Sequence, residues 1–172
     1  MNKPRSRTVW LGAVILAVLG VGLGLWRWST ADAPVVGRRA PDFNLQLLQG
    51  GTVNLAQFRG RPVLLNFWAS WCPPCVEEMP ALQQVAGEGR AAVLAVNVGE
   101  SGSEAAAFLR RHDIDLPVAL DGQGELITRY RVAGLPQTFF IDADGVIRHV
   151  ERGAMTYQEI LTILTRMERK GA

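Results

Sequence analysis

The sequence predicts an α/β domain that follows a single transmembrane helix. Three observations support this fold class. Two nearly continuous apolar runs are typical of buried strands, helix-capping patterns occur later in the chain, and residues 8–26 form an uncharged run of 19 residues. A helix that spans a bilayer needs roughly 20 apolar residues. The 172 residues leave room for one domain of ordinary size besides that helix.

The charge of the chain is unevenly distributed. Eighteen Lys and Arg residues stand against 16 Asp and Glu residues, but four of the basic residues and no acidic residue lie within the first 28 positions. The rest of the chain is therefore slightly acidic, which argues against nucleic acid as a partner. A composition that is 48% hydrophobic and 20% charged excludes a disordered chain and a polytopic membrane protein.

The N-terminal segment predicts a membrane anchor. Tryptophans occur at both ends of the apolar run, and three basic residues precede it, which favours a cytoplasmic N-terminus. We expect residues 1–7 to lie in the cytoplasm, residues 8–28 to cross the membrane, residues 29–36 to form a linker, and residues 37–172 to form the extracytoplasmic domain. The alternative is a cleaved signal peptide, because Ala31-Asp32-Ala33 resembles a cleavage site, although the following proline would obstruct cleavage.

The first half of the domain predicts strands around one helix. Residues 43–47 and 52–54 flank a Gln-Gly-Gly turn and predict a short hairpin. Residues 62–69 and 91–98 are the two apolar runs, and they predict central strands that are buried on both faces. A helix over residues 73–86 connects them.

The second half begins and ends with helices. Ser101-x-x-Glu104 is a capping box that predicts a helix through residue 111, and Thr156-x-x-Glu159 predicts a terminal helix in the same way. Residues 138–141 and 146–150 flank Asp142-Ala-Asp-Gly145, which predicts a turn between antiparallel strands. Calcium binding by that turn is a weaker interpretation, since the remaining ligands of a calcium loop are missing.

The cysteine pair predicts thiol chemistry. Trp71-Cys72-Pro73-Pro74-Cys75 lies where a buried strand gives way to a helix, so the helix N-terminus favours Cys72 as the nucleophilic thiolate and Cys75 as the resolving thiol. The two prolines remove amide donors and leave the Cys75 amide available, so we expect a weakly stabilised thiolate and a reducing dithiol. Two cysteines are too few for a four-thiolate zinc site, and we expect neither a metal nor a cofactor.

Helix geometry separates the two neighbouring acidic residues. At about 100° per residue, Glu78 falls on the same apolar face as Cys75, Leu82 and Val85, whereas Glu77 falls on the polar face. Burial would raise the pKa of the Glu78 carboxyl and suit it to exchange protons with a thiol. The alternative is that both glutamates are solvated at the helix rim.

The order of motifs resembles the membrane-anchored thioredoxin-fold reductases of bacterial cytochrome c maturation, which include ResA-like, TlpA-like and DsbE-like proteins. The motifs are A-P-D-F-N-L at 40–45, F-W-A-S-W-C-P-P-C at 67–75, V-N-V-G-E-S at 96–101, L-P-V-A-L-D at 116–121 and G-L-P-Q-T-F-F-I-D at 134–142. The resemblance covers residues 37–170. It implies a thioredoxin fold, a central mixed sheet flanked by helices, with an N-terminal β-hairpin extension and a central insertion near residues 116–132.

The resemblance also implies roles for individual residues. Pro136, preceded by Leu135, corresponds to the cis-proline loop that lies against the cysteine pair and binds the substrate backbone. Glu78 corresponds to the buried active-site glutamate and Glu100 to a second acidic residue near the site, although Glu100 also directly precedes a helix cap. Trp71 corresponds to a tryptophan that shapes the docking surface, and a core aromatic would look the same in the sequence.

The function implied is disulfide reduction outside the cytoplasm, at the bacterial inner membrane. The expected substrate is the haem-binding C-x-x-C-H pair of apocytochrome c, and a polytopic membrane thiol reductase would supply the electrons. Other extracytoplasmic disulfides, including copper-site cysteine pairs, and a non-catalytic peptide- or metal-binding module are alternatives. Peroxide reduction is disfavoured, because Ala69 stands where peroxiredoxins need a threonine. The Pro-Pro pair departs from the ResA-like Glu-Pro and leaves the reduction potential open.

Overall fold

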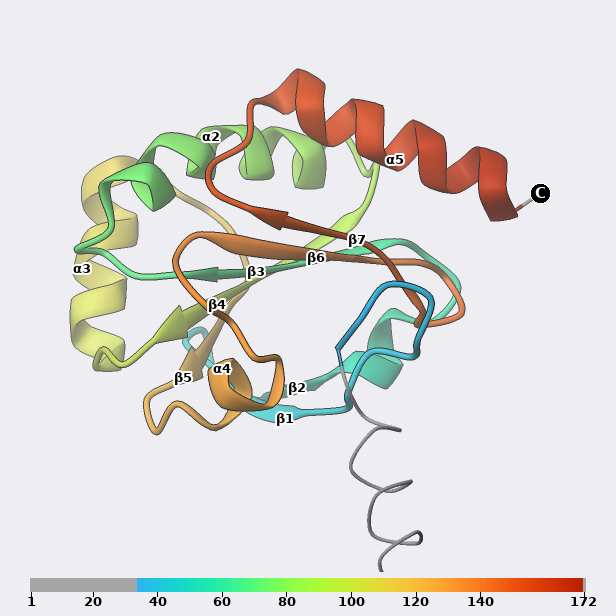
Figure 1. The fold of residues 1–172 in the computed structure, drawn as a ribbon. Helices are drawn as coiled ribbons and strands as arrows, with labels where there is room; N and C mark the ends of the chain where they lie inside the picture. Colours follow the sequence, from blue (N-terminus) through green and yellow to red (C-terminus); the bar gives the residue numbers. More distant parts are fainter. Residues whose placement is uncertain (1–33, 172) are drawn as a thin grey trace, which may run out of the picture. The chain divides into compact units, whose positions relative to one another are not determined.

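A computed structural model of the chain describes residues 34–171, which form a seven-stranded mixed sheet with helices on both faces (Figure 1). The elements are β1 (Asn44–Leu47), β2 (Thr52–Asn54), the 3-10 helix η1 (Leu55–Phe58), β3 (Val63–Trp68), α2 (Pro73–Gly87), β4 (Ala92–Val98), α3 (Gly102–His112), β5 (Val118–Asp121), α4 (Glu125–Arg129), β6 (Gln137–Ile141), β7 (Ile147–Arg152) and α5 (Tyr157–Gly171). The strand order is β2-β1-β5-β4-β3-β6-β7. The prediction of an α/β domain is therefore confirmed.

The two apolar runs form the centre of the sheet. β3 and β4 pair in parallel, and every residue of β3 is buried. Side chains alternate between the two faces of a strand. Leu64 and Trp68 accordingly join the core under α2 and α5, while Leu65 and Phe67 join a second core on the opposite face. Side chains of β3 therefore belong to the hydrophobic cores on both faces of the sheet, as its nearly continuous apolar sequence predicted.

Both predicted hairpins are present. β1 and β2 pair in antiparallel register around the glycine turn, and β6 and β7 pair around the Asp142–Gly145 turn. In that turn the Asp142 carboxylate accepts hydrogen bonds from the backbone amides of Asp144 and Val146 (both 2.9 Å). Gly145 has φ +79°, a left-handed conformation that glycine adopts without steric cost. The turn interpretation is therefore confirmed.

Three elements escaped the sequence analysis: η1, β5 and α4. η1 and β5 have four residues each and α4 has five, so the sequence pattern of each is short. β5 is held by nonlocal pairing, parallel to β4 and antiparallel to β1. The N-cap residue of α4 is Gly124, which has no side chain to cap a helix. Instead, the buried Asp121 carboxylate accepts hydrogen bonds from the amides of Leu126 and Ile127. β5 and α4 lie within the predicted central insertion.

The two predicted capping boxes begin their helices. At α3, the Ser101 hydroxyl accepts from the Glu104 amide (3.3 Å) and the Glu104 carboxylate accepts from the Ser101 amide (2.8 Å). At α5, Thr156 and Glu159 make the same reciprocal pair. α5 packs against α2 on one face of the sheet, and α4 lies on the other face (Figure 1).

The predicted transmembrane segment, residues 8–28, lies outside the described residues. Within residues 34–171, no helix has the length and apolar character needed to cross a membrane. The described chain begins along the outer edge of β7, where the Gly37 amide donates to the Ile147 carbonyl (2.8 Å) and the Ile147 amide donates to the Arg38 carbonyl (2.9 Å). A few residues later, the buried Tyr130 hydroxyl donates to the Pro41 carbonyl (2.6 Å).

The Tyr130 hydrogen bond yields a prediction about stability. Tyr130→Phe leaves the buried Pro41 carbonyl without its donor, so we expect the free energy of unfolding to fall by about 1–2 kcal/mol. Urea unfolding of the oxidised full chain in mild detergent measures this change. Tyr157→Phe is the matched control, because the Tyr157 hydroxyl donates to Glu88 at the exposed surface and should contribute little. Equal effects of the two substitutions would show that the Pro41 contact does not stabilise the fold.

Candidate active site

The cysteine pair lies at the junction between β3 and α2, as the sequence predicted. Cys72 is the N-cap residue of α2 and Cys75 lies in its first turn. Their sulfur atoms form a disulfide, with Cα atoms 5.3 Å apart. Cys72 is 4% exposed and Cys75 is fully buried, so Cys72 is the sulfur that an incoming partner can reach more easily.

The amides of the first turn do not remain free in this disulfide form. The Cys75 amide donates to the Cys72 carbonyl (3.0 Å), and the Val76 amide donates to the same oxygen (3.2 Å). The expectation that the Cys75 amide is available was therefore wrong here. Pro73 and Pro74 have no amide hydrogen, so the first two N–H groups of α2 belong to Cys75 and Val76. Both donate to the carbonyl oxygen of Cys72, the N-cap residue.

Glu78 lies in the protein interior, one turn after Cys75. Its side chain is 1% exposed, whereas Glu77 is exposed, which confirms the helix geometry deduced from the sequence. One carboxylate oxygen accepts from the Asn66 amide group (2.5 Å), and the other accepts from the Met155 backbone amide (3.1 Å). Burial raises the pKa of Glu78 from 4.5 to about 7, even though both hydrogen bonds favour the charged form.

Asn66 connects Glu78 to the sheet. It lies in the middle of β3, on the same face as Leu64 and Trp68, and its amide group also donates to the Thr138 hydroxyl (2.9 Å). The Asn66 carbonyl oxygen is buried and has no hydrogen-bond partner among the described residues. Sequence reasoning missed Asn66 and Thr138 as site residues. The available signal was a single polar residue inside an apolar strand.

Glu100 lies beside the loop that precedes the cysteines. Its carboxylate accepts from the Ser70 amide (2.8 Å), from the Ser70 hydroxyl and from the Asn97 amide group (2.7 Å). The α3 cap is made by Ser101 and Glu104, so Glu100 takes no part in it. Glu100 therefore links Ser70, two residues before Cys72, to Asn97 near the end of β4. This position is near the cysteine pair, as the resemblance implied.

The Leu135–Pro136 peptide bond is cis, as the resemblance implied. Leu135 packs against the core that contains both cysteines, and Pro136 is buried directly before β6. Trp71 is 68% exposed, so the interpretation of Trp71 as a core aromatic is wrong. An exposed tryptophan therefore lies next to the disulfide.

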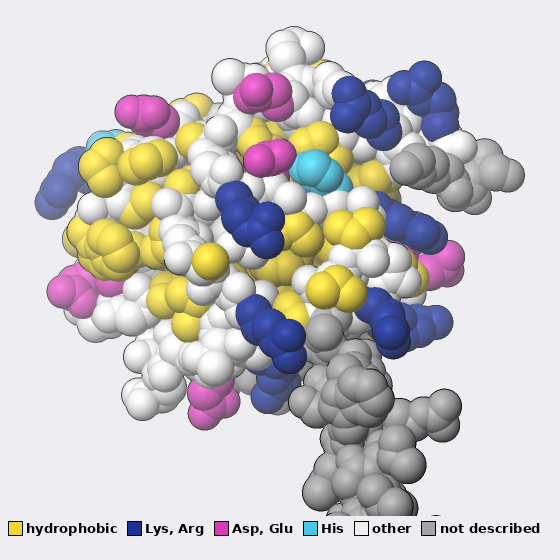
Figure 2. Space-filling model, in the orientation of Figure 1, with side chains coloured by type: hydrophobic (Ala, Val, Ile, Leu, Met, Phe, Trp, Pro, Cys, Tyr) yellow, Lys and Arg dark blue, Asp and Glu magenta, His cyan; other side chains and the backbone are white. Residues whose placement is uncertain are grey.

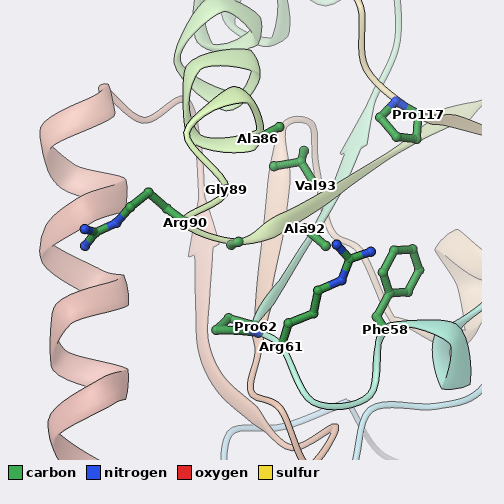
Figure 3. A pocket seen from close by; sticks show the side chains of 10 residues that line it. Phe58, Arg61, Pro62, Ala86, Gly89, Arg90, Ala92, Val93 and Pro117 are labelled. Carbon is green, nitrogen blue, oxygen red and sulfur yellow. The ribbon is translucent and has the colours of Figure 1, made fainter.

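The described residues contain no cluster typical of a metal centre, and the hollow shown in Figure 3 lies away from the disulfide. Within residues 34–171, no three His, Cys, Asp or Glu side chains are grouped as metal ligands would be. The hollow in Figure 3 lies between the starts of β3 and β4, whereas Cys72 follows the other end of β3. Its side chains are mostly small or apolar, and the Arg61 guanidinium lies 5.4 Å from the centre of the Phe58 ring.

The raised pKa of Glu78 makes stability depend on pH. Between pH 4.5 and about 7 the folded chain binds a proton that the unfolded chain releases, so stability falls as pH rises through this range. At about pH 8 the buried carboxylate costs roughly 3 kcal/mol. We expect Glu78→Gln to recover much of this stability at pH 8 and to change little at pH 4.5. Urea unfolding at both pH values, with Glu77→Gln as control, measures the effect. A Glu78→Gln gain that is the same at both pH values would contradict the assigned pKa.

Comparisons with known proteins agree with this geometry. Residues 36–150 match the AhpC/TSA family. The chain is 35% identical over 164 residues to the thiol-disulfide oxidoreductase ResA of Geobacillus kaustophilus, covering 92% of this chain and 94% of that protein. A Chlorobium tepidum structure assigned as thiol:disulfide interchange protein DsbE is 33% identical, with a TM-score of 0.69 over 76% of this chain and 98% of its own.

A third relative is the exposed lipoprotein thioredoxin Etrx1 of Streptococcus pneumoniae, which is 34% identical with a TM-score of 0.63 over 73% of this chain and 99% of its own. These matches confirm the expected thioredoxin-like fold. The chain belongs to the AhpC/TSA family of thioredoxin-fold proteins, and within it to the ResA-like thiol-disulfide oxidoreductases.

Proposed function

We propose that the chain reduces disulfides of extracytoplasmic proteins through Cys72, Cys75 and Glu78. The Cys72 thiolate attacks a substrate disulfide, forms a mixed disulfide and releases one substrate thiolate. Cys75 then attacks Cys72, which releases the second substrate thiolate and restores the Cys72–Cys75 disulfide. The observation that carries the proposal is the pairing of this disulfide with a buried carboxyl group one helical turn away.

The first turn of α2 supports transfer in the reducing direction. A dithiol oxidises its partners strongly when its thiolate is strongly stabilised. Here two positions of the first turn are prolines, and the next two amides already donate to the Cys72 carbonyl. The helix dipole remains, but the directed N–H groups that would stabilise a thiolate are few.

Glu78 supports a proton-exchange step. Cys75 is fully buried, so its thiol must lose a proton inside the protein before it can attack Cys72. A carboxyl group with a pKa near 7 can accept that proton at neutral pH and return it later. We assign Glu78 this role because it shares the inner face of α2 with Cys75.

The surface next to Cys72 supports binding of an extended substrate. Trp71 presents an exposed aromatic ring beside the disulfide, and Leu135 and Pro136 form the loop that we assign to the substrate backbone. A tryptophan buries a large area when a partner covers it. Trp71 would therefore contribute to affinity, while Cys72 carries the reaction.

The charge pattern of the N-terminal segment and the names of the relatives together favour a cellular location and a substrate. We assign residues 1–7 to the cytoplasm, residues 8–28 to a single membrane span, residues 29–36 to a linker and residues 37–172 to the periplasmic side of the bacterial inner membrane. The proposed substrate is the C-x-x-C-H pair of apocytochrome c, and a polytopic membrane thiol reductase would recycle the disulfide. The match to ResA supports this choice over other extracytoplasmic disulfides.

Trapping the mixed disulfide tests the proposal. In Cys75→Ser the resolving thiol is absent, so a Cys72-linked adduct should accumulate when the full chain meets an oxidised apocytochrome c. Non-reducing electrophoresis and mass spectrometry identify the linkage. Cys72→Ser, which retains only the buried Cys75 thiol, should give at most a trace of adduct.

Changing the test substrate or the cysteines of the chain distinguishes apocytochrome c reduction from the two alternatives, another reductase substrate and a binding module. An apocytochrome with both haem-binding cysteines changed to serine should give no adduct. An adduct in native membranes made only with other proteins would show a different reductase substrate. Apocytochrome binding that persists after both Cys72 and Cys75 become alanine would show a binding module instead.

A further inference from the structure

The residues that lead into the domain lie along the exposed edge of the sheet. β7 is the last strand, and the backbone of Gly37 and Arg38 pairs with Ile147 at its start. The preceding Val35 and Val36 side chains are 49% and 59% exposed, which is unusual for the large apolar residues of the described chain. We call residues 34–39 the entry segment.

Two hollows flank the entry segment, and arginines line both. One is formed by Val36 and Gly37 together with β7 and α5, and it contains Arg148 and Arg166. The other is formed by residues 34–36 together with β6, β7 and the end of α4, and it contains Arg131 and Arg152. Neither set of lining residues includes an acidic side chain. All four arginines are exposed.

Within the described part of the chain, most of these arginines form no ion pair, and Arg166 also lines a neighbouring hollow with Glu151 and Glu159. Arg148 pairs with Asp142 at 2.6 Å, but among residues 34–171 no ion pair involves Arg131, Arg152 or Arg166. Arg39 donates to a backbone carbonyl, which carries no net charge. Because the chain beyond residue 28 has more acidic than basic residues, this excess of basic side chains is local. Figure 2 shows basic side chains spread over this face from α5 to the region below β7.

We infer that this arginine face, defined as the entry segment with Arg131, Arg152 and Arg166, rests on anionic phospholipid headgroups. The inference depends on the proposed anchor at residues 8–28. Only six residue steps, at most roughly 20 Å of extended chain, separate position 28 from position 34. Guanidinium groups bind phosphate through paired hydrogen bonds, and basic residues near an anionic bilayer add attraction.

The contact would set the height of the active site above the membrane. Arg152 is opposite Gln137 in the β6–β7 pairing, and Gln137 directly follows Pro136. The arginine face therefore continues to within one residue of the proposed substrate loop. Resting on lipid, the domain would keep this loop close to the membrane surface, within reach of the proposed integral-membrane electron donor.

Hydrogen exchange of the full chain in nanodiscs tests the contact. In discs that contain phosphatidylglycerol, compared with phosphatidylcholine alone, residues 34–39 and the β7 edge should exchange several-fold more slowly by mass spectrometry. High salt should abolish the difference. A triple variant, Arg131→Gln with Arg152→Gln and Arg166→Gln, should lose it too. The control, Arg110→Gln with Arg111→Gln on α3, should keep it.

Two results would overturn the inference. Exchange that is the same in both kinds of disc, or that the control variant changes as much as the triple variant, would show that the arginine face does not bind lipid. Alkaline carbonate extraction of native membranes distinguishes this failure from failure of the anchor. A chain released by carbonate would refute the anchor, and the docking with it. A chain that resists carbonate but shows no lipid-dependent exchange would refute the docking alone.

Discussion

The burial of one carboxyl group constrains the design of this protein. Glu78 lies between α2 and the sheet, where its charged form is poorly solvated and is held by one side-chain amide and one backbone amide. The proposed function assigns this carboxyl to proton exchange with Cys75, which lies one turn earlier on the same helix. The same burial makes the charged form of Glu78 costly. When Glu78 is charged, it therefore lowers the stability of the folded protein. Protein sites that trade stability for chemistry in this way are common.

The surrounding elements hold this group in place. Asn66 of β3 and the Met155 amide, in the loop between β7 and α5, both donate to the Glu78 carboxyl. Asn66 also donates to Thr138 of β6, so residues from three segments distant in sequence form this network. Among residues 34–171, the buried Asn66 carbonyl oxygen has no hydrogen-bond partner. If the Asn66 side chain turned over, that oxygen could accept a hydrogen bond from protonated Glu78. The network is thus compatible with either protonation state of Glu78, as the proposed proton exchange requires.

Regular structure made part of this site predictable. Glu78 could be placed inward and Glu77 outward because α2 runs without a break through both, so a period of 3.6 residues applies. β3 and β4 were evident from their uninterrupted apolar character. By contrast, β5 has four residues and depends on strands from two other parts of the chain, and α4 is capped by a side chain from β5. Asn66 gave no sign of its partner, because contact between a strand and a helix is not encoded in the spacing of either.

The pH dependence of disulfide exchange in Glu78→Gln tests the central claim most directly. The rate at which the reduced full chain resolves its mixed disulfide should rise in the parent protein as pH increases through about 7, where Glu78 becomes a base. Glu78→Gln should react more slowly at neutral pH and lose that rise, while remaining folded. A variant with the parent's rate and the parent's pH profile would show that the buried carboxyl takes no part in proton exchange.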